Sequence, residues 1–215
     1  DVMFLCNPNN PTGILVEQEL LLRILERAES RSILLVLDEC FLDFTGQEER
    51  SLIQKTTEYK YLFILKSFTK MYAMPGIRLG YLLTANEALI RRAEQAGQAW
   101  GMSCVAESAG IAAAKAHDDW AARTSRAIRP LREELKKGLE ALGFSVKNGQ
   151  ANFLCFHAPG YPDLEQRLLQ KQILLRSCGN YEGLGLEDYR TAVRTDTENA
   201  RLLQALKEIT GEEHR

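Results

Sequence analysis

The chain has 215 residues, of which 45% are hydrophobic and 26% charged, so it is long and apolar enough to bury a core. Its 27 basic and 29 acidic residues leave a net charge of −2, which offers no positive surface for nucleic acid or an anionic membrane. No apolar run approaches the roughly 20 residues of a membrane-spanning helix, so we expect neither a nucleic-acid nor a membrane partner.

The first 120 residues alternate short apolar runs with segments of helical periodicity. The apolar runs predict strands at residues 2–6, 33–37, 61–65 and 79–83. Apolar residues at helical spacing predict helices at residues 17–28, 86–96 and 103–116. This alternation is typical of an α/β layer built on a mostly parallel sheet.

The rhythm of the sequence changes after residue 120. The patterns predict a long helix at 118–142, strands at 153–156, 173–175 and 189–194, and helices at 163–171 and 196–209. Pro130 predicts a kink or a break in the long helix. Thr195 and Glu198 have the spacing of a capping box at the start of the last helix. We therefore predict two domains, residues 1–120 and a smaller α+β domain at 121–215.

The five cysteines are scattered along the chain without a C-x-x-C pair, and they lie in or beside apolar segments. This usage predicts free, partly buried thiols in a reducing compartment, and hence a cytoplasmic protein. The three histidines lie far apart, and none falls in a ligand spacing, so we expect no metal site.

Polar residues follow three of the predicted strands, at the positions where open α/β sheets bind ligands. The first strand leads into Asn7-Pro-Asn-Asn-Pro-Thr-Gly13, the second into Asp38-Glu39, and the third into Ser67-Phe-Thr-Lys70. A lysine amine can attack a carbonyl group, and an arginine such as Arg78, eight residues on, offers a planar fork suited to phosphate. Each piece alone could be a turn, a helix cap or a surface residue.

Together these segments resemble the class I and II aminotransferases among the fold-type I pyridoxal-phosphate enzymes. The resemblance lies in residues 7–13, in Leu37-Asp38-Glu39 and in the stretch from Ser67 to Tyr81, in that order and each after a predicted strand. It implies pyridoxal 5′-phosphate as the cofactor and a homodimer for the full-length protein. It also implies that Lys70 is the catalytic residue, which would hold the cofactor covalently and then move the proton at the substrate carbon.

The resemblance assigns the other cofactor contacts residue by residue. Asp38 would pair with the protonated ring nitrogen, and Asn10 would bond to the phenolic oxygen of the ring. Ser67 and Arg78 would bind the cofactor phosphate. Phe41 stands where many members of the family have a tyrosine that also touches the phenolic oxygen, so that contact is missing here.

Three arginines are candidates for binding the substrate. The resemblance implies that Arg190 binds the α-carboxylate, although it could instead be a structural salt-bridge partner. Arg194 lies four residues further along the predicted strand and so would face the same side. Arg176 lies on a nearby predicted strand, and we hypothesise that it and Arg194 bind a substrate phosphate. The alternative for Arg194 is an ion pair with Glu198.

Residues 173–184 and 189–195 resemble the threonine-phosphate decarboxylases of cobalamin biosynthesis, which are similar to the histidinol-phosphate aminotransferases. The first reaction would be decarboxylation of L-threonine O-3-phosphate to aminopropanol phosphate, and the second would be transfer of an amino group to 2-oxoglutarate. An alternative of another class is the ligand-sensing domain of a transcription regulator, which would carry a basic helix-turn-helix region that this chain lacks.

Against this family, the chain corresponds to the second half of the cofactor-binding domain followed by the small C-terminal domain. Its first residues also form an apolar run typical of an interior strand. We therefore expect a C-terminal fragment of a larger enzyme, with little activity on its own.

Overall fold

The structure is a computed structural model that describes residues 1–116 and 119–212. Its contacts divide the chain into two compact units, which are described separately below. One unit comprises Asp1–Asn7 and Val16–Thr124, and the other comprises Pro8–Leu15 and Ser125–Arg215. The chain passes between them inside helix α5 (Trp120–Ala141), and the short loop Pro8–Leu15 groups with the C-terminal residues.

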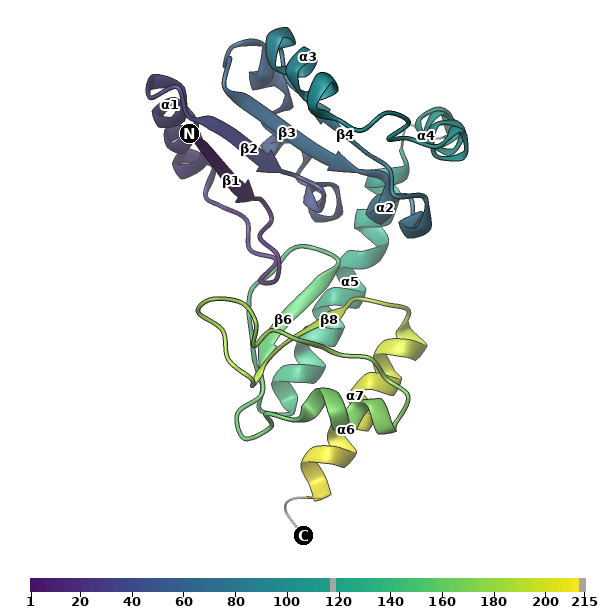
Figure 1. Cartoon of the computed structure of the whole chain (residues 1–215). Helices are drawn as coiled ribbons and strands as arrows, with labels where there is room; N and C mark the ends of the chain where they lie inside the picture. The colour runs from purple at the N-terminus through teal and green to yellow at the C-terminus, as the bar shows by residue number, and fades with distance from the viewer. Residues whose placement is uncertain (117–118, 213–215) are drawn as a thin grey trace. The chain divides into compact units, whose positions relative to one another are not determined.

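The first unit is built on a four-stranded sheet in the order β1-β2-β3-β4 (Figure 1). Its strands are β1 (Val2–Cys6), β2 (Leu34–Asp38), β3 (Leu62–Ser67) and β4 (Gly80–Leu83). The first three are parallel, and β4 runs antiparallel to β3. Its helices are α1 (Gln18–Ser30), α2 (Phe68–Met71), α3 (Glu87–Ala96) and α4 (Cys104–Ala116), with 3-10 turns at Leu42–Thr45, Glu48–Arg50, Ile53–Thr57 and Pro75–Ile77. The predicted α/β class with a parallel-rich sheet is confirmed.

Helix α1 covers one face of this sheet. Its buried Leu21 and Leu25 lie in one core cluster with Leu35 and Leu37 of β2 and with Ile64 of β3. Since successive strand residues point to opposite faces, the aliphatic runs at residues 33–37 and 61–65 place every second side chain in this core. The remaining side chains of each strand face the other side of the sheet.

The second unit pairs an antiparallel sheet with three helices. Strands β5 (Ser145–Val146), β6 (Phe153–His157), β8 (Asp188–Ala192) and β7 (Arg176–Ser177) lie in the order β5-β6-β8-β7. Figure 1 shows α5, α6 (Leu164–Gln170) and α7 (Asp196–Glu212) against one side of β6 and β8. Leu154, Phe156 and Tyr189 point from this face of the sheet into the helical core. The alternate residues of β6 and β8 therefore face away from the helices.

Two sequence-based expectations about the second unit are wrong, and one is narrowed. Residues 173–175 are not a strand, because they follow the end of α6. Gln172 adopts a left-handed conformation with φ 59°, and the Ile173 N–H bonds to the Leu168 carbonyl at 3.0 Å. This is the Schellman ending of a helix, which uses an apolar residue at the position of Ile173. The strand begins only at Arg176.

The other two results concern Pro130 and Arg194. Helix α5 continues through the exposed Pro130, so the predicted break is absent, whereas the alternative of a kink stays a prediction. Strand β8 ends at Ala192, so Arg194 lies beyond it and does not share a strand face with Arg190. One half of the predicted capping box is present at the start of α7, since the Glu198 carboxylate accepts a hydrogen bond from the Thr195 N–H at 3.4 Å and another from the Thr195 hydroxyl at 2.7 Å. The predicted start of α5 at residue 118 lies outside the described residues.

Within the described ranges, no helix combines the length and the apolar character that crossing a membrane requires.

Candidate active site

Asp38 and Ser67 lie at the carboxyl ends of the neighbouring parallel strands β2 and β3. Asp38 is the register partner of Leu65, two residues before Ser67, so both polar side chains belong to the sheet face opposite α1. Asp38 is half-buried, and its Oδ1 accepts a hydrogen bond from the Cys40 N–H at 2.9 Å. No cation lies within ion-pair distance of this carboxylate among the residues described. The half-buried negative charge is therefore open to a positively charged ligand group.

Lys70 sits on α2, the short helix that follows β3 directly. Ser67 caps this helix, since its Oγ accepts a hydrogen bond from the Thr69 N–H at 3.1 Å. The Lys70 side chain is exposed, and its Nζ lies 5.9 Å from the centre of the Phe41 ring. In the described part of the chain it makes no salt bridge, so its amine is accessible for chemistry.

Arg78 closes the same edge of the sheet. The Leu79 carbonyl accepts a hydrogen bond from the Phe68 N–H at 3.1 Å, and Gly80 is the register partner of Ser67. Arg78 has φ 55°, a left-handed conformation that a side chain makes unfavourable and that often marks functional sites. Its Nη1 donates to the Pro75 carbonyl at 3.0 Å, and no acid pairs with it in the described structure. Its guanidinium thus keeps donors for an anion.

The opposite face of the same strand ends carries a buried ion cluster that sequence reasoning missed. Lys66 Nζ lies 2.6 Å from Asp43 Oδ1 and 3.6 Å from Glu39 Oε2. The Glu39 carboxylate is fully buried and also accepts bonds from the Ser51 hydroxyl at 2.5 Å and the Leu52 N–H at 2.9 Å. The side chains of two adjacent acidic residues therefore point to opposite sides of the sheet. The Glu39 carboxylate is buried and has a cation and hydrogen-bond donors as partners, whereas the Asp38 carboxylate has no cation partner among the described residues.

Arg176 and Arg190 are direct neighbours across β7 and β8 in the second unit. They share the sheet face that points away from the helices with Cys155, the β6 partner of Arg190. Burial raises the pKa of the Cys155 thiol to about 11, so it stays neutral and adds no negative charge. Two like charges directly opposite each other destabilise a strand pair, unless an anion compensates them.

The partners of these two arginines are neutral. Arg190 Nη1 donates to the Asn10 Oδ1, and its guanidinium lies 5.1 Å from the centre of the Phe153 ring. Arg176 Nη2 donates to Asn180 Oδ1 at 2.9 Å and lies over the Tyr181 ring at 5.8 Å. No acid forms an ion pair with either arginine among the described residues. The pair of Arg176 and Arg190 is therefore a candidate site for anionic groups, and the loop that carries Asn10 is part of this site.

Arg194 forms the ion pair with Glu198 that the sequence analysis gave as its alternative role. Its Nη2 lies 2.6 Å from Glu198 Oε1, and its Nε donates to the same oxygen at 2.8 Å. The hydrogen bond from Arg194 lowers the pKa of the exposed Glu198 to about 2, so the pair is ionised at neutral pH. The structure therefore places Arg194 outside the candidate anion site formed by Arg176 and Arg190.

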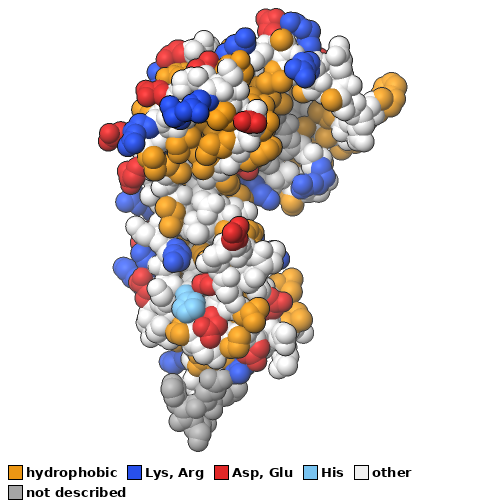
Figure 2. Space-filling model, turned by 60° about the vertical axis from the view of Figure 1, so that its left-hand side comes forward, with side chains coloured by type: hydrophobic (Ala, Val, Ile, Leu, Met, Phe, Trp, Pro, Cys, Tyr) orange, Lys and Arg blue, Asp and Glu red, His pale blue; other side chains and the backbone are white. Residues whose placement is uncertain are grey.

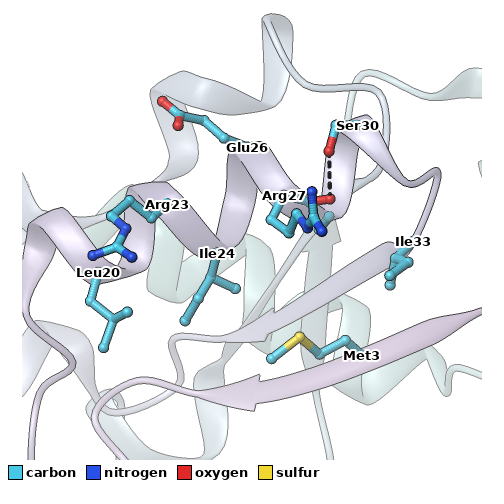
Figure 3. A pocket seen from close by; sticks show the side chains of 9 residues that line it. Met3, Leu20, Arg23, Ile24, Glu26, Arg27, Ser30 and Ile33 are labelled. Carbon is cyan, nitrogen blue, oxygen red and sulfur yellow. Dashed lines mark hydrogen bonds between the residues drawn. The ribbon is translucent and has the colours of Figure 1, made fainter.

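A hollow of about 740 Å³ lies elsewhere, between α1 and the amino-terminal half of β1. Figure 3 shows Leu20 and Ile24 pointing from α1 toward the strand that carries Met3, with Arg23 and Arg27 along the helix. Figure 2 shows hydrophobic side chains gathered on this unit, and Phe4 of the edge strand is 76% exposed. Open α/β sheets bind ligands at the carboxyl ends of their strands, so we place the candidate site at Asp38 and Lys70 instead.

Comparison with known proteins identifies the family of the chain. The family model of aminotransferase class I and II matches residues 1–206. The chain belongs to the class I and II aminotransferase family. In this member of the family, polar residues follow the ends of β2 and β3, whereas the aliphatic residues of these strands lie in the core.

Two kinds of enzyme are found among the curated relatives. This member of the family is 39% identical over 97% of its length to a threonine-phosphate decarboxylase of Salmonella typhimurium. It is 36% identical over 97% of its length to a histidinol-phosphate aminotransferase of Desulfitobacterium hafniense. It covers 57% and 56% of these two proteins, so the chain spans a little over half the length of the curated relatives it matches.

A solved relative supports the fold of the whole chain. The histidinol-phosphate aminotransferase of Clostridium acetobutylicum is 31% identical and superposes with a TM-score of 0.92. The match covers 99% of this chain and 64% of that structure.

Within the described residues, no cluster of three or more His, Cys, Asp or Glu side chains could hold a metal ion.

Proposed function

We propose that this chain is part of a pyridoxal-phosphate-dependent enzyme that acts on a phosphorylated amino compound. The reaction we favour is decarboxylation of L-threonine O-3-phosphate to aminopropanol phosphate, a step of cobalamin biosynthesis. The observation that carries this proposal is the 39% identity to a threonine-phosphate decarboxylase over nearly the whole chain. The second candidate is an aminotransferase acting on histidinol phosphate, supported by relatives at 36% identity.

The residues of the first unit suit the cofactor. Asp38, Lys70 and Arg78 carry the three charges that pyridoxal phosphate needs around it, and none of them is in an ion pair within the described structure. This contrasts with Lys66 and Glu39 on the opposite sheet face, which are buried and paired. Charges left open beside fully satisfied ones are consistent with a site that receives a charged ligand.

Each side chain has a role that follows from its chemistry. The Asp38 carboxylate would hold a protonated ring nitrogen, and Arg78 and the Ser67 hydroxyl would bind the phosphate. Lys70 would supply the amine that holds the cofactor and would then carry the proton at the substrate carbon. When bound, pyridoxal phosphate supplies a ring that accepts the electrons of whichever substrate bond stands perpendicular to it.

The second unit would bind the substrate. Asn10 would bond to the phenolic oxygen of the cofactor, while Arg190 would bind the carboxylate and Arg176 the phosphate of the substrate. Both arginines offer two parallel donors, the geometry that carboxylate and phosphate accept. Their positions would decide which substrate bond is held perpendicular to the ring, and so whether carbon dioxide or a proton leaves.

The reaction is tested with the full-length protein and pyridoxal phosphate. We expect carbon dioxide release from L-threonine O-3-phosphate and no glutamate from histidinol phosphate plus 2-oxoglutarate. Glutamate formation without carbon dioxide release would establish the second candidate instead. If neither product forms while Lys70 still binds the cofactor, the phosphorylated substrate class itself is wrong.

Because Arg194 is engaged with Glu198, Arg194→Gln tests its hypothesised part in substrate binding. We expect the apparent affinity for threonine phosphate to change less than about twofold, whereas Arg176→Gln should weaken it at least about tenfold through loss of a charge-assisted contact. The two variants are matched in chemistry and differ in the partners of the arginine. A tenfold loss in Arg194→Gln would restore Arg194 to the phosphate site.

The same proposal includes the setting of the enzyme. We propose a homodimer in the cytoplasm, with residues 1–120 as part of the large cofactor-binding domain and 121–215 as the small domain. The five cysteines are free thiols, which is consistent with a reducing compartment. Light scattering of the full-length protein would test the dimer.

A further inference from the structure

We infer that Arg132 is a positioning residue: it anchors the loop Pro8–Leu15 and thereby sets Asn10 and Arg190 for binding. The inference concerns contacts inside the second unit. It rests on the proposed function for the roles of Asn10 and Arg190, but the anchoring itself can be measured without any reaction.

Arg132 is a buried cation on α5, only 6% exposed. Its Nη1 donates to two consecutive backbone carbonyls, Gln150 at 2.8 Å and Ala151 at 3.2 Å. Its Nε–H has no hydrogen-bond partner in the described chain, and the nearest acid, Glu133, stands 3.9 Å away. Burial lowers the pKa of Arg132, so this guanidinium is held at a cost. The hydrogen bonds to the carbonyls of residues 150 and 151 offset this cost.

The segment that Arg132 holds touches the Asn10 loop through backbone atoms. The Gln150 N–H donates to the Gly13 carbonyl at 2.7 Å. A Cβ placed on Gly149 would lie 2.5 Å from the Thr12 carbonyl oxygen and 3.1 Å from the Gly13 Cα. Only glycine allows this approach, because backbone atoms cannot move aside as a flexible side chain can.

The loop is closed on itself and can transmit this contact. The Gly13 N–H bonds to the Asn9 carbonyl at 2.6 Å, and the Asn9 N–H bonds to the Ile14 carbonyl at 2.9 Å. The Asn9 side chain adds a bond to the Thr12 hydroxyl at 2.8 Å. Asn10 lies inside this ring of bonds, and its Oδ1 accepts the hydrogen bond of Arg190.

Anchoring at Gly13 therefore fixes Asn10, and Asn10 fixes one donor of Arg190. Arg132 touches neither cofactor nor substrate in this scheme and acts only through the loop. Loss of the anchor should loosen residues 8–15 and weaken substrate binding, while leaving the amine of Lys70 able to hold the cofactor.

The test compares Arg132→Lys and Gly149→Ala with Leu135→Ala. Lysine keeps the charge but loses the planar fork, and alanine at 149 opens the same contact from the other side. Leu135, 1% exposed on the same helix, lies in the helical core and serves as the control for lost stability. Hydrogen exchange of residues 8–15 is measured in the cofactor-free protein, together with KM and kcat of the loaded enzyme.

We expect exchange in residues 8–15 to rise about tenfold in Arg132→Lys and in Gly149→Ala, but not in Leu135→Ala. KM should rise about tenfold in each variant, with a smaller change in kcat. In the protein that carries both Arg132→Lys and Gly149→Ala, the free-energy change in KM should be less than the sum of the two single changes. Unchanged exchange in both variants would overturn the anchoring. Faster exchange with unchanged KM would overturn the positioning role. A wild-type enzyme without turnover would contradict the proposed function alone, because exchange would still decide the anchoring.

Discussion

Replacing Lys70 by alanine should abolish covalent retention of pyridoxal phosphate and lower kcat by about 10²–10⁴-fold, the range expected when a positioned proton carrier is removed. The Lys70 side chain is exposed and forms no ion pair among the described residues, so its loss should leave the thermal midpoint almost unchanged. Absorbance of the loaded protein before and after borohydride reduction measures the attachment. Loss of function without loss of stability is the signature of a chemical role.

Two matched variants sharpen this result. Lys70→Arg keeps a cation over the Phe41 ring but supplies a group that does not lose its proton, so it should be as inactive as alanine. Lys60→Ala removes another exposed lysine of the same unit and should behave as wild type. Borohydride-stable cofactor on the Lys70→Ala protein would contradict the assignment of this lysine.

Lys66→Met should be strongly destabilising, lowering the free energy of unfolding by about 3–5 kcal/mol. It leaves the fully buried Glu39 without its cation, although the bonds from Ser51 and Leu52 remain. Burial already raises the pKa of Glu39 despite these bonds. Burial also pulls the pKa of Lys66 down, but the carboxylates of Asp43 and Glu39 outweigh it and raise that pKa overall.

The pH dependence of this variant has a definite sign. An acid whose pKa is raised in the folded state binds more protons when folded, so stability falls as pH rises above the unfolded value near 4.5. Removing Lys66 raises the pKa of Glu39 further, and the deficit of Lys66→Met should therefore be smaller at pH 5 than at pH 8. Urea unfolding at both values measures it. Lys55→Met, in an exposed pair with Glu58, is the control and should change little. An equal deficit at both pH values would mean that Glu39 is not the group left uncompensated.

Most of the first unit could be predicted because its strands are continuous aliphatic runs. Residues 33–37 and 61–65 could be read directly as buried strands, and the parallel order then brought Asp38 and Ser67 to one edge. Lys70 follows from the same reasoning, since α2 begins where β3 ends. The ion cluster around Lys66 was missed because Lys66 lies 23 residues from Asp43 in the sequence, and the two meet only in the folded structure. A buried lysine at an inward strand position is the signal that could have revealed it.

The second unit was less predictable because its strands are short. Strand β7 has two residues, and the apolar run before it belongs to the ending of α6. Arg194 was placed on β8 by extending a period-two pattern past Ala192, where the chain turns instead toward the capping box of α7. The contact between Gly13 and Gly149 also left no local pattern, since backbone contacts between distant loops depend on tertiary structure.

The pairing of Arg176 with Arg190 links ligand binding to the integrity of the sheet edge. Strand β7 is two residues long, and among the described residues the cross-strand partner of Arg176 is a like charge, Arg190. An anion seated between the guanidinium groups would turn that repulsion into a bridge and stabilise the folded form by mass action. The stability of the β7–β8 strand pair would then vary with the anion concentration of the solution. Sulfate and phosphate buffers would act as partial substitutes for the substrate, and a melting temperature for this protein has meaning only with its anion concentration stated.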